Sequence, residues 1–485
     1  MKKYYKIIII VSSLIISFAI LEAMKAKTIY NPKNVVHAST VAENLTEPDE
    51  PKIKTKSQSS EFNMQSMYNK KSLLLLQKER MSKGGVIGTD GKGVVALRFD
   101  DYQNIFRKKI YPLLVTRGLP CSMALISQFN TAQKWGIGTT WNEVKEWNRN
   151  GVEIWSHGTD HRDYSLKGYA GLYSQIVTSK AEIEAHNIKV AGWALPGVEP
   201  VTRNLPYNGL TQPSDYNSEV GRLLIQTYAL TEAYAYKPQR ILPTNIYHGL
   251  NHFTVSDGSG ETLADSEKVI NAAIKNKSGI ELMCHPGNLG KRGNMTLAEF
   301  TTLLDYIKKQ WDNGSIEVLT PSGLCFADPN KSTRLKLNVD DSFEGLTAAH
   351  PGAWNETSSW TGKTIETSGG RTGNNFLRIN NDVTNSGVTQ KIMNLNKLGV
   401  SGEQFVFNGW FRPYGKGDTI GVVQINDYNN SKKFKIVYKA VSKGASWKNV
   451  RFVFGVPPTT KNIELSLYRS AGAGIDWDDV SIKII

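Results

Sequence analysis

The middle of the chain alternates short apolar segments with helical patterns, and this alternation limits the folds open to it. Strands are expected at residues 94–99, 121–126, 153–156, 190–194, 226–230, 279–284 and 317–319. Helices are expected between them, at residues 105–117, 142–150, 170–186, 263–276 and 297–313. Such alternation favours a parallel sheet covered by helices. Seven strands over about 230 residues predict an α/β fold, a distorted (β/α)7-type barrel, with its functional groups at the C-terminal ends of the strands.

The last third of the chain has a different pattern, with short alternating strands and many Gly, Asn, Ser and Thr turns. Strands are expected at residues 404–411, 419–425, 433–438, 447–454 and 463–468. This pattern is typical of an antiparallel, all-β sandwich. We therefore expect a barrel domain at residues 91–328 and a β-sandwich domain at residues 338–485, separated by a polar segment.

The N-terminal segment has the features of an export signal. Lys2, Lys3 and Lys6 precede an apolar stretch at residues 7–21, and a small-residue site ends at Ala38. The stretch is short for a membrane-spanning helix, so residues 1–38 are expected to be a signal peptide or, if uncleaved, a signal anchor. A polar linker is expected at residues 39–90, with one short helix near residues 71–81. The protein is therefore expected to be secreted or bound to the cell surface or cell wall.

The net charge bears on the binding partners of the protein, and the cysteine content bears on its crosslinks. The formal net charge of +14 favours anionic surroundings, but no arginine-rich run or nucleic-acid motif occurs, so a wall or membrane is favoured over nucleic acid. The three cysteines, Cys121, Cys284 and Cys325, form no disulfide framework and are expected to be small buried apolar residues.

Carboxylates and histidines follow three of the expected strands. Asp100 and Asp101 end the first, His157 and His161 follow the third, and His285 follows the sixth. A hydrolytic zinc site needs about three protein ligands and an open position for water, with a nearby base. Adjacent aspartates can divide these roles only if the strand ends at that point. The alternative is that the aspartate pair caps the next helix.

A second histidine pair, His248 and His252, has the same spacing as His157 and His161. No clear strand leads into it. We therefore expect these two histidines to have a structural or groove-lining role rather than to bind a metal.

The strand-end residues resemble the polysaccharide deacetylases with a nodulation-protein-B homology domain, carbohydrate esterase family 4. The matching motifs are Arg-Phe-Asp-Asp-Tyr at 98–102, His-Gly-Thr-Asp-His at 157–161 and Met-Cys-His at 283–285, within a resemblance that covers roughly residues 92–325. The resemblance implies that Asp100 is the catalytic base and that Asp101, His157 and His161 bind the metal, Zn²⁺ or another divalent transition metal. It also implies that His285 is the catalytic acid.

The chain departs from the family pattern at several positions. The third motif of the family supplies an arginine that orients the catalytic aspartate, and its best match here has Ala194 in that place. The fourth motif has no clean counterpart, and residues 231–234 are where one would be expected. Tyr102 replaces a glycine and Gly158 a hydroxyl residue. These departures imply a divergent substrate or reduced activity.

The C-terminal region resembles jelly-roll carbohydrate-binding modules in its first and last strands. That resemblance makes Glu344 and Asp479 candidates for a structural Ca²⁺ site. Five aromatic residues are candidates for stacking on sugars, and two in a loop-like segment, Trp354 and Trp360, are expected to be the more exposed. The other three are Trp410, Tyr414 and Trp447.

Together these patterns predict an exported, metal-dependent polysaccharide N-deacetylase. Its expected substrate is an amino-sugar polymer, such as peptidoglycan, a chitin-like polymer or poly-N-acetylglucosamine. Two alternatives remain open: a non-catalytic carbohydrate-binding or adhesion protein with a degenerate barrel, and an O-acetyl carbohydrate esterase. The O-acetyl esterase differs from the N-deacetylase only in the leaving group.

Overall fold

A computed structural model describes most of the chain after residue 68. The described residues are 69–129, 138–162, 167–197, 210, 213–233, 239–255, 261–347, 349–356, 362–381, 386–431 and 434–485. The expected export segment at 1–38 and the linker up to residue 68 lie outside this part. Among the described residues, no helix is both long and apolar enough to cross a membrane.

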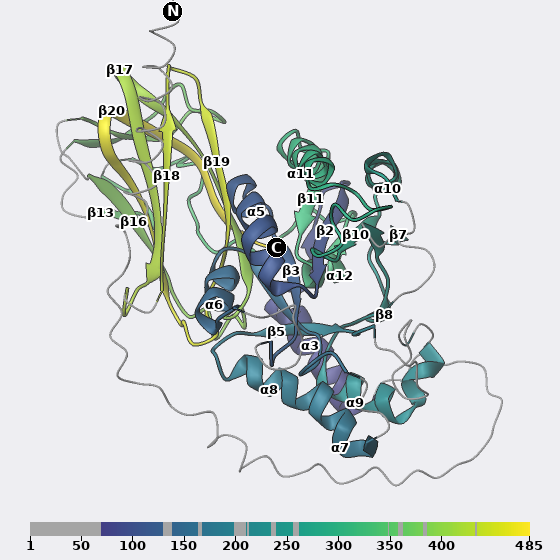
Figure 1. Cartoon of the computed structure of the whole chain (residues 1–485). Helices are drawn as coiled ribbons and strands as arrows, with labels where there is room; N and C mark the ends of the chain where they lie inside the picture. The colour runs from purple at the N-terminus through teal and green to yellow at the C-terminus, as the bar shows by residue number, and fades with distance from the viewer. Residues whose placement is uncertain are drawn as a thin grey trace, which may run out of the picture. The chain divides into compact units, whose positions relative to one another are not determined.

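A curled parallel sheet forms the first part of the fold (Figure 1). Its central strand β2 (Gly93–Asp100) is buried along its whole length and pairs in parallel with β3 (Cys121–Leu125) and β10 (Gly279–Cys284). The other parallel strands are β4 (Val152–Ser156), β5 (Val190–Ala194), β6 (Thr231–Glu232), β8 (His248–Leu250), β9 (Phe253–Val255) and β11 (Ile316–Leu319). Strand β8 lies at one end of the strand order, and β9, which follows β8 in the chain, pairs with β10 near the other end, so the sheet curls into a partial barrel. The predicted fold class is confirmed.

Well-capped helices connect these strands. Three of them begin with a capping box, in which a threonine and an acidic residue three positions later bond to each other's backbone N–H. These are α6 (Trp141–Arg149), α10 (Leu263–Asn276) and α11 (Leu297–Asp312). The helix predicted at 71–81 is α3 (Lys70–Ser82). The one predicted at 105–117 is α4 (Gln103–Ile105), η3 (Phe106–Ile110) and α5 (Tyr111–Arg117), because a π-helical turn interrupts it.

The strand predicted at 226–230 is wrong. Helix α9 (Glu219–Thr227) occupies the start of that segment, with its first turn capped by the Ser218 side chain, and the sheet strand β6 begins only at Thr231. Tyr228 and Leu230 are buried between them. Short apolar runs look alike in buried helices and buried strands, so their periodicity could not separate the two.

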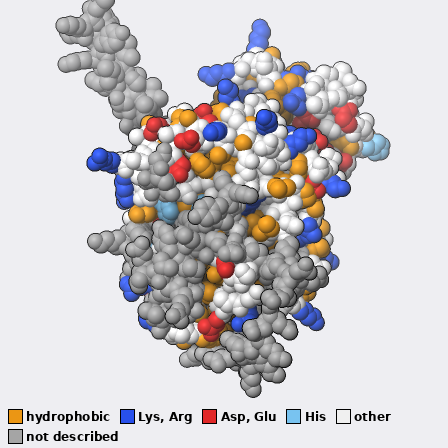
Figure 2. Space-filling model, turned by 90° about the vertical axis from the view of Figure 1, so that its right-hand side faces the viewer, with side chains coloured by type: hydrophobic (Ala, Val, Ile, Leu, Met, Phe, Trp, Pro, Cys, Tyr) orange, Lys and Arg blue, Asp and Glu red, His pale blue; other side chains and the backbone are white. Residues whose placement is uncertain are grey.

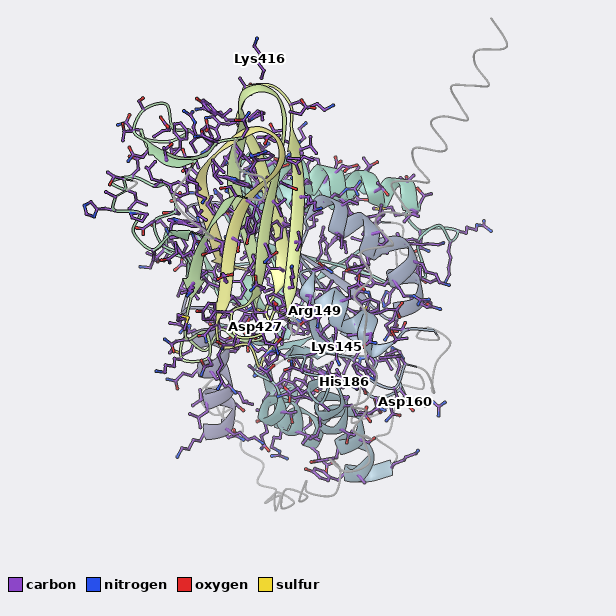
Figure 3. The ribbon with its side chains drawn as sticks, turned by 90° about the vertical axis from the view of Figure 1, so that its left-hand side faces the viewer. Lys145, Arg149, Asp160, His186, Lys416 and Asp427 are labelled. Carbon is purple, nitrogen blue, oxygen red and sulfur yellow. The ribbon has the colours of Figure 1, made fainter. Side chains whose placement is uncertain are left out.

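The C-terminal region is entirely antiparallel, as predicted. Its longest strands, β17 (Gln404–Asp427) and β20 (Ile463–Ile484), pair along their length, and an interruption between Tyr414 and Thr419 places Lys416 at the tip of a bend (Figure 3). β17 also pairs with β18 (Lys435–Ser442) and β19 (Lys448–Gly455). The remaining strands are β13 (Asn355–Glu356), β14 (Lys363–Glu366), β15 (Phe376–Ile379) and β16 (Gly387–Ile392).

Buried ion pairs join the C-terminal sheet to the barrel. Lys83 Nζ lies 2.7 Å from Glu403 Oε2, and Lys189 pairs with both Glu403 and Glu79. We call these four residues the junction cluster. Beside it, the carbonyl of Ile485 accepts a hydrogen bond from Lys83 Nζ at 3.3 Å. The two regions therefore share polar contacts as well as an apolar core.

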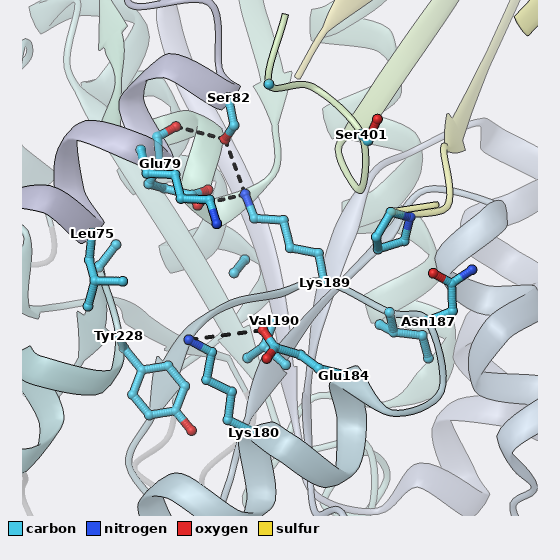
Figure 4. A pocket seen from close by; sticks show the side chains of 16 residues that line it. Leu75, Glu79, Ser82, Lys180, Glu184, Asn187, Lys189, Val190, Tyr228 and Ser401 are labelled. Carbon is cyan, nitrogen blue, oxygen red and sulfur yellow. Dashed lines mark hydrogen bonds and ion pairs between the residues drawn. The ribbon is translucent and has the colours of Figure 1, made fainter. Parts of the chain in front are cut away.

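A cavity of about 380 Å³ lies next to the junction cluster (Figure 4). Lys189 extends along it toward Glu79 and Ser82, and Lys180 and Glu184 lie across from them. Basic side chains are spread over the face in Figure 2 among acidic and apolar ones rather than gathered in one patch.

Candidate metal centre and catalytic site

The end of β2 separates the two adjacent aspartates. The strand ends at Asp100, and Asp101 and Tyr102 then have left-handed backbone conformations, with φ of 60° and 46°. The next helix has Tyr102 as its N-cap, and no side chain caps it. The aspartate pair is therefore not a helix cap, and its two carboxylates are free to take different roles.

The two histidines of the second motif lie in the turn that follows β4. His157 Nδ1–H donates a hydrogen bond of 2.8 Å to the carbonyl oxygen of Ala194 at the end of β5. A carbonyl can only accept, so this bond fixes the tautomer and leaves the Nε2 lone pair of His157 available. Ala194, which stands where the family has an arginine, thus contributes its backbone to the site.

A glutamine that the sequence did not single out supports this turn. The buried Gln175 accepts a hydrogen bond from the Thr159 N–H at 3.0 Å and donates one of 2.7 Å to Asp160. A Cβ at Gly158 would lie 2.2 Å from Gln175 Oε1, and Gly158 has a φ of +81°. Glycine replaces the family's hydroxyl residue here because Gln175 fills the space.

Asp101, His157 and His161 converge on one point. The Nε2 atoms of both histidines lie 3.4 Å from Asp101 Oδ1, and all three side chains are buried. Bonds of about 2.0–2.1 Å at tetrahedral angles would place such ligand atoms about 3.3–3.4 Å apart. Asp101 Oδ1 is buried and has no hydrogen-bond partner among the described residues, an arrangement that a cation would stabilise. The three residues therefore fit a tetrahedral metal with one open position.

The pKa values of the two aspartates are lowered by different neighbouring residues. Burial raises the pKa of Asp101, but His161 and His157 outweigh burial and lower it. Burial likewise raises the pKa of Asp100, but the Arg98 guanidinium outweighs it and holds that pKa far below its usual range. Asp100 is therefore ionised at every pH at which the protein is expected to work.

His285 completes the group at the strand ends. It is half-buried, directly follows β10, and interacts electrostatically with Asp100, Asp101 and His161. Its buried Nδ1 atom has no hydrogen-bond partner among the described residues. A ring nitrogen in this position can transfer a proton to a group bound at the site.

A second group of possible metal ligands, Glu232, His252 and Glu281, lies deeper in the barrel. Arg240 Nη2 lies 2.9 Å from Glu232 and 2.7 Å from Glu281, and Arg98 pairs with the same carboxylates. Two guanidinium groups therefore already contact these carboxyl groups, and we interpret the group as an ion-pair network rather than a metal site.

The other histidine of the second pair, His248, is buried against Tyr216, and burial lowers the pKa of His248 to about 3. It is therefore a neutral side chain in the barrel. His252 lies near Arg98 and Asp100, so the pair is divided between the core and the surroundings of the site.

The aromatic candidates of the C-terminal region separate into two groups. The expected exposure of Trp354 is wrong, because it is 1% exposed, packs on Phe343 and donates a hydrogen bond to Asp340 O. Trp360 lies outside the described residues. The other three are partly or well exposed, and each carries an arginine over its ring: Arg371 on Trp410, Arg378 on Tyr414 and Arg412 on Trp447.

The two candidates for calcium, Glu344 and Asp479, both contact the loop at residues 371–375. Glu344 accepts hydrogen bonds from the Asn374 and Asn375 N–H groups, and Asp479 pairs with Arg371. Among the described residues, neither belongs to a group of three or more close metal ligands. Calcium binding stays a prediction.

Part of the barrel is similar to a known protein family. Residues 87–200 match the family model described as polysaccharide deacetylase, and they include the two aspartates and the first histidine pair. No protein with a curated description matches the chain.

Several solved structures are similar to part of the chain. The CBM22-1 and GH10 modules of Clostridium thermocellum endo-1,4-β-D-xylanase 10B show 17% identity and a TM-score of 0.24, over 31% of this chain and 28% of that one. TmCBM61, solved with β-1,4-galactotriose, shows 13% identity and a TM-score of 0.24, over 30% of this chain and 97% of that one. The CBM22-1 xylan-binding domain of Paenibacillus barcinonensis Xyn10C shows 12% identity and a TM-score of 0.26, over 32% and 97%.

Proposed function

We propose that this chain, which carries a polysaccharide deacetylase domain at residues 87–200, is an exported, metal-dependent N-deacetylase of an amino-sugar polymer. The observation that carries the proposal is the convergence of Asp101, His157 and His161 beside a separate, ionised Asp100. A site built only for stability would not leave a buried carboxylate oxygen, Asp101 Oδ1, without a hydrogen-bond partner among the described residues. The proposed substrate is a polymer with N-acetylated sugars at the cell surface or in the cell wall.

The residues present can carry out amide hydrolysis. A divalent metal held by Asp101, His157 and His161 would lower the pKa of a water molecule and polarise the acetyl carbonyl. Asp100 accepts a proton from the attacking water as the water oxygen bonds to the acetyl carbon. His285 donates a proton to the amide nitrogen as the carbon–nitrogen bond breaks, which releases acetate and a free amine.

The C-terminal sheet supports a role in holding the polymer. Trp410, Tyr414 and Trp447 are partly exposed and each has an arginine over its ring, so these pairs offer hydrogen-bond donors for the hydroxyl groups of sugars together with some apolar ring surface. We propose that this sheet binds the polysaccharide on which the barrel acts.

The test is acetate release by the full chain from N-acetylglucosamine polymers, peptidoglycan and acetylated xylan, with Zn²⁺ removed and restored. We expect metal-dependent release from at least one N-acetylated polymer. Release from acetylated xylan alone would favour an O-acetyl esterase. No release from any polymer, together with no bound metal, would refute the proposal.

The variant Asp100→Asn separates the two aspartates. It should lose at least about 10³-fold in kcat because the base is gone, while its metal content stays at the wild-type level. Loss of the metal instead would show that the roles of Asp100 and Asp101 are reversed. Asp305→Asn, which alters an exposed ion pair with Arg117 on the helical surface, is the matched control and should keep full activity.

A further inference from the structure

A charged side chain lies inside the central strand of the barrel. Arg98 is 1% exposed, and its neighbours along β2 are apolar, apart from Asp100. A buried guanidinium is costly unless charged or polar partners surround it. The contacts of Arg98 therefore indicate what the residue does.

The first contact is with Asp100. Arg98 Nε lies 2.8 Å from Asp100 Oδ1, and Nη2 lies 2.7 Å from Oδ2. The two residues are two positions apart on one strand, so their side chains project from the same face of the sheet. This paired contact fixes both the position and the plane of the Asp100 carboxylate, since each oxygen has its own donor.

Other strands hold Arg98 in turn. Its Nη1 lies 3.1 Å from Glu281 Oε1 on β10 and 3.4 Å from Glu232 Oε2 on β6. Arg240 on β7 (Gln239–Arg240) bonds to the same two carboxylates from the other side. Burial lowers the pKa of the Arg98 guanidinium, but the charges of Asp100 and Glu281 outweigh burial and raise it. The guanidinium therefore stays charged.

We propose that Arg98 is the positioning residue for Asp100. At Ala194, where the family resemblance placed an arginine for this role, the methyl side chain has no donor. Arg98 supplies the guanidinium from β2 itself, and Glu281, Glu232 and Arg240 keep it in place. This inference rests on the proposed deacetylase function, and it implies that the loss of arginine at position 194 leaves the site complete.

The test compares kcat, KM and bound metal for Arg98→Lys and Arg98→Met with those of the wild type. Lysine keeps the charge but cannot donate to both oxygens at once. We expect kcat to fall about 100-fold in Arg98→Lys and further in Arg98→Met, as a misplaced catalytic group would produce. KM should change less than about threefold, and the metal content should not change. Arg98→Lys decides the matter if Arg98→Met does not fold.

The matched control is Arg334→Lys. Arg334 is another largely buried arginine, paired with Glu317 at 3.0 Å on the edge of the same sheet, but it does not contact Asp100. It should keep the wild-type kcat. If Arg98→Lys matches this control, or loses the metal, or raises KM instead of lowering kcat, the positioning role is refuted. Absence of wild-type activity would instead refute the proposed function itself.

Discussion

The contacts of the junction cluster predict that the variant Glu403→Gln has a lower free energy of unfolding than the wild type. Glu403 is 2% exposed and is shared by Lys83 and Lys189, whose side chains are 0% and 23% exposed. Glutamine keeps the size of the side chain and removes the charge. Lys83 would then retain Glu153, 3.5 Å away, and the Ile485 carbonyl, and Lys189 would retain Glu79, 2.6 Å away.

The size of the effect follows from the pKa of Glu403. Burial raises this pKa, but Lys189 and Lys83 outweigh burial and lower it from 4.5 to about 2. A shift of this size corresponds to about 3 kcal/mol of free energy of unfolding at neutral pH. Removing one partner of a buried ion pair costs about 3–5 kcal/mol in general, so the two estimates agree. Relief of repulsion with Glu79 reduces the loss somewhat.

The dependence on pH has a definite sign. Because the pKa of Glu403 is lower in the folded protein, its contribution to stability is complete above about pH 4.5 and is lost as the pH falls toward about 2. The difference between Glu403→Gln and the wild type should therefore be largest at neutral pH. It should shrink as the solution is made acidic.

Urea denaturation of the full chain, followed by tryptophan fluorescence at pH 7 and pH 4, measures this difference. Asp305→Asn is again the control, since Asp305 is 61% exposed and exposed pairs contribute about 0–1 kcal/mol. We expect a loss of about 3 kcal/mol at pH 7 in Glu403→Gln. A loss no larger than that of the control, or one that grows on acidification, would refute the reasoning.

Other predictions concern the metal, the turn and the thiols. Asp101→Asn should bind less than about a tenth of the wild-type metal while keeping its fold, as measured by elemental analysis and circular dichroism; full occupancy would remove Asp101 from the site. Gly158→Ser should weaken metal binding about tenfold or more, because its Cβ would meet Gln175 and its backbone is left-handed, and unchanged affinity would contradict this. The three cysteines are buried and form no disulfide, so a thiol reagent should modify three groups per chain in denaturant and none rapidly in the native protein.

The sequence predicted regular, locally determined features well. The strands at Val190–Ala194 and Gly279–Cys284 and the helix at Leu263–Asn276 were predicted with the observed bounds. Each combines a clear periodicity with a clear start or stop signal. The sequence also placed Asp101, His157 and His161 at strand ends, and they lie close together because strand-end residues of a parallel barrel lie at the same edge. Their binding of a metal stays a prediction.

Features that depend on distant contacts were missed. Arg98 stood in the first motif, but the sequence does not show which carboxylates surround it, since Glu232 and Glu281 come from strands far along the chain. A charged residue within an apolar strand was the signal that could have drawn attention to it. Trp354 was misplaced because a loop-like sequence does not reveal that its ring packs on Phe343.

The contacts between the end of the C-terminal strand and the barrel limit how the C-terminal sheet could be replaced by a different module. The Ile485 carbonyl accepts hydrogen bonds from both Lys83 and the Thr320 hydroxyl, and Glu403 neutralises two ammonium groups of the barrel. A replacement module joined only at the polar segment after residue 328 would leave Lys83 and Lys189 without Glu403, and would leave Lys83 and Thr320 without the Ile485 carbonyl. Replacement of the whole sheet by another domain would therefore disrupt the barrel as well. New ligand preferences would arise more readily by substitution of residues on the exposed face of the sheet.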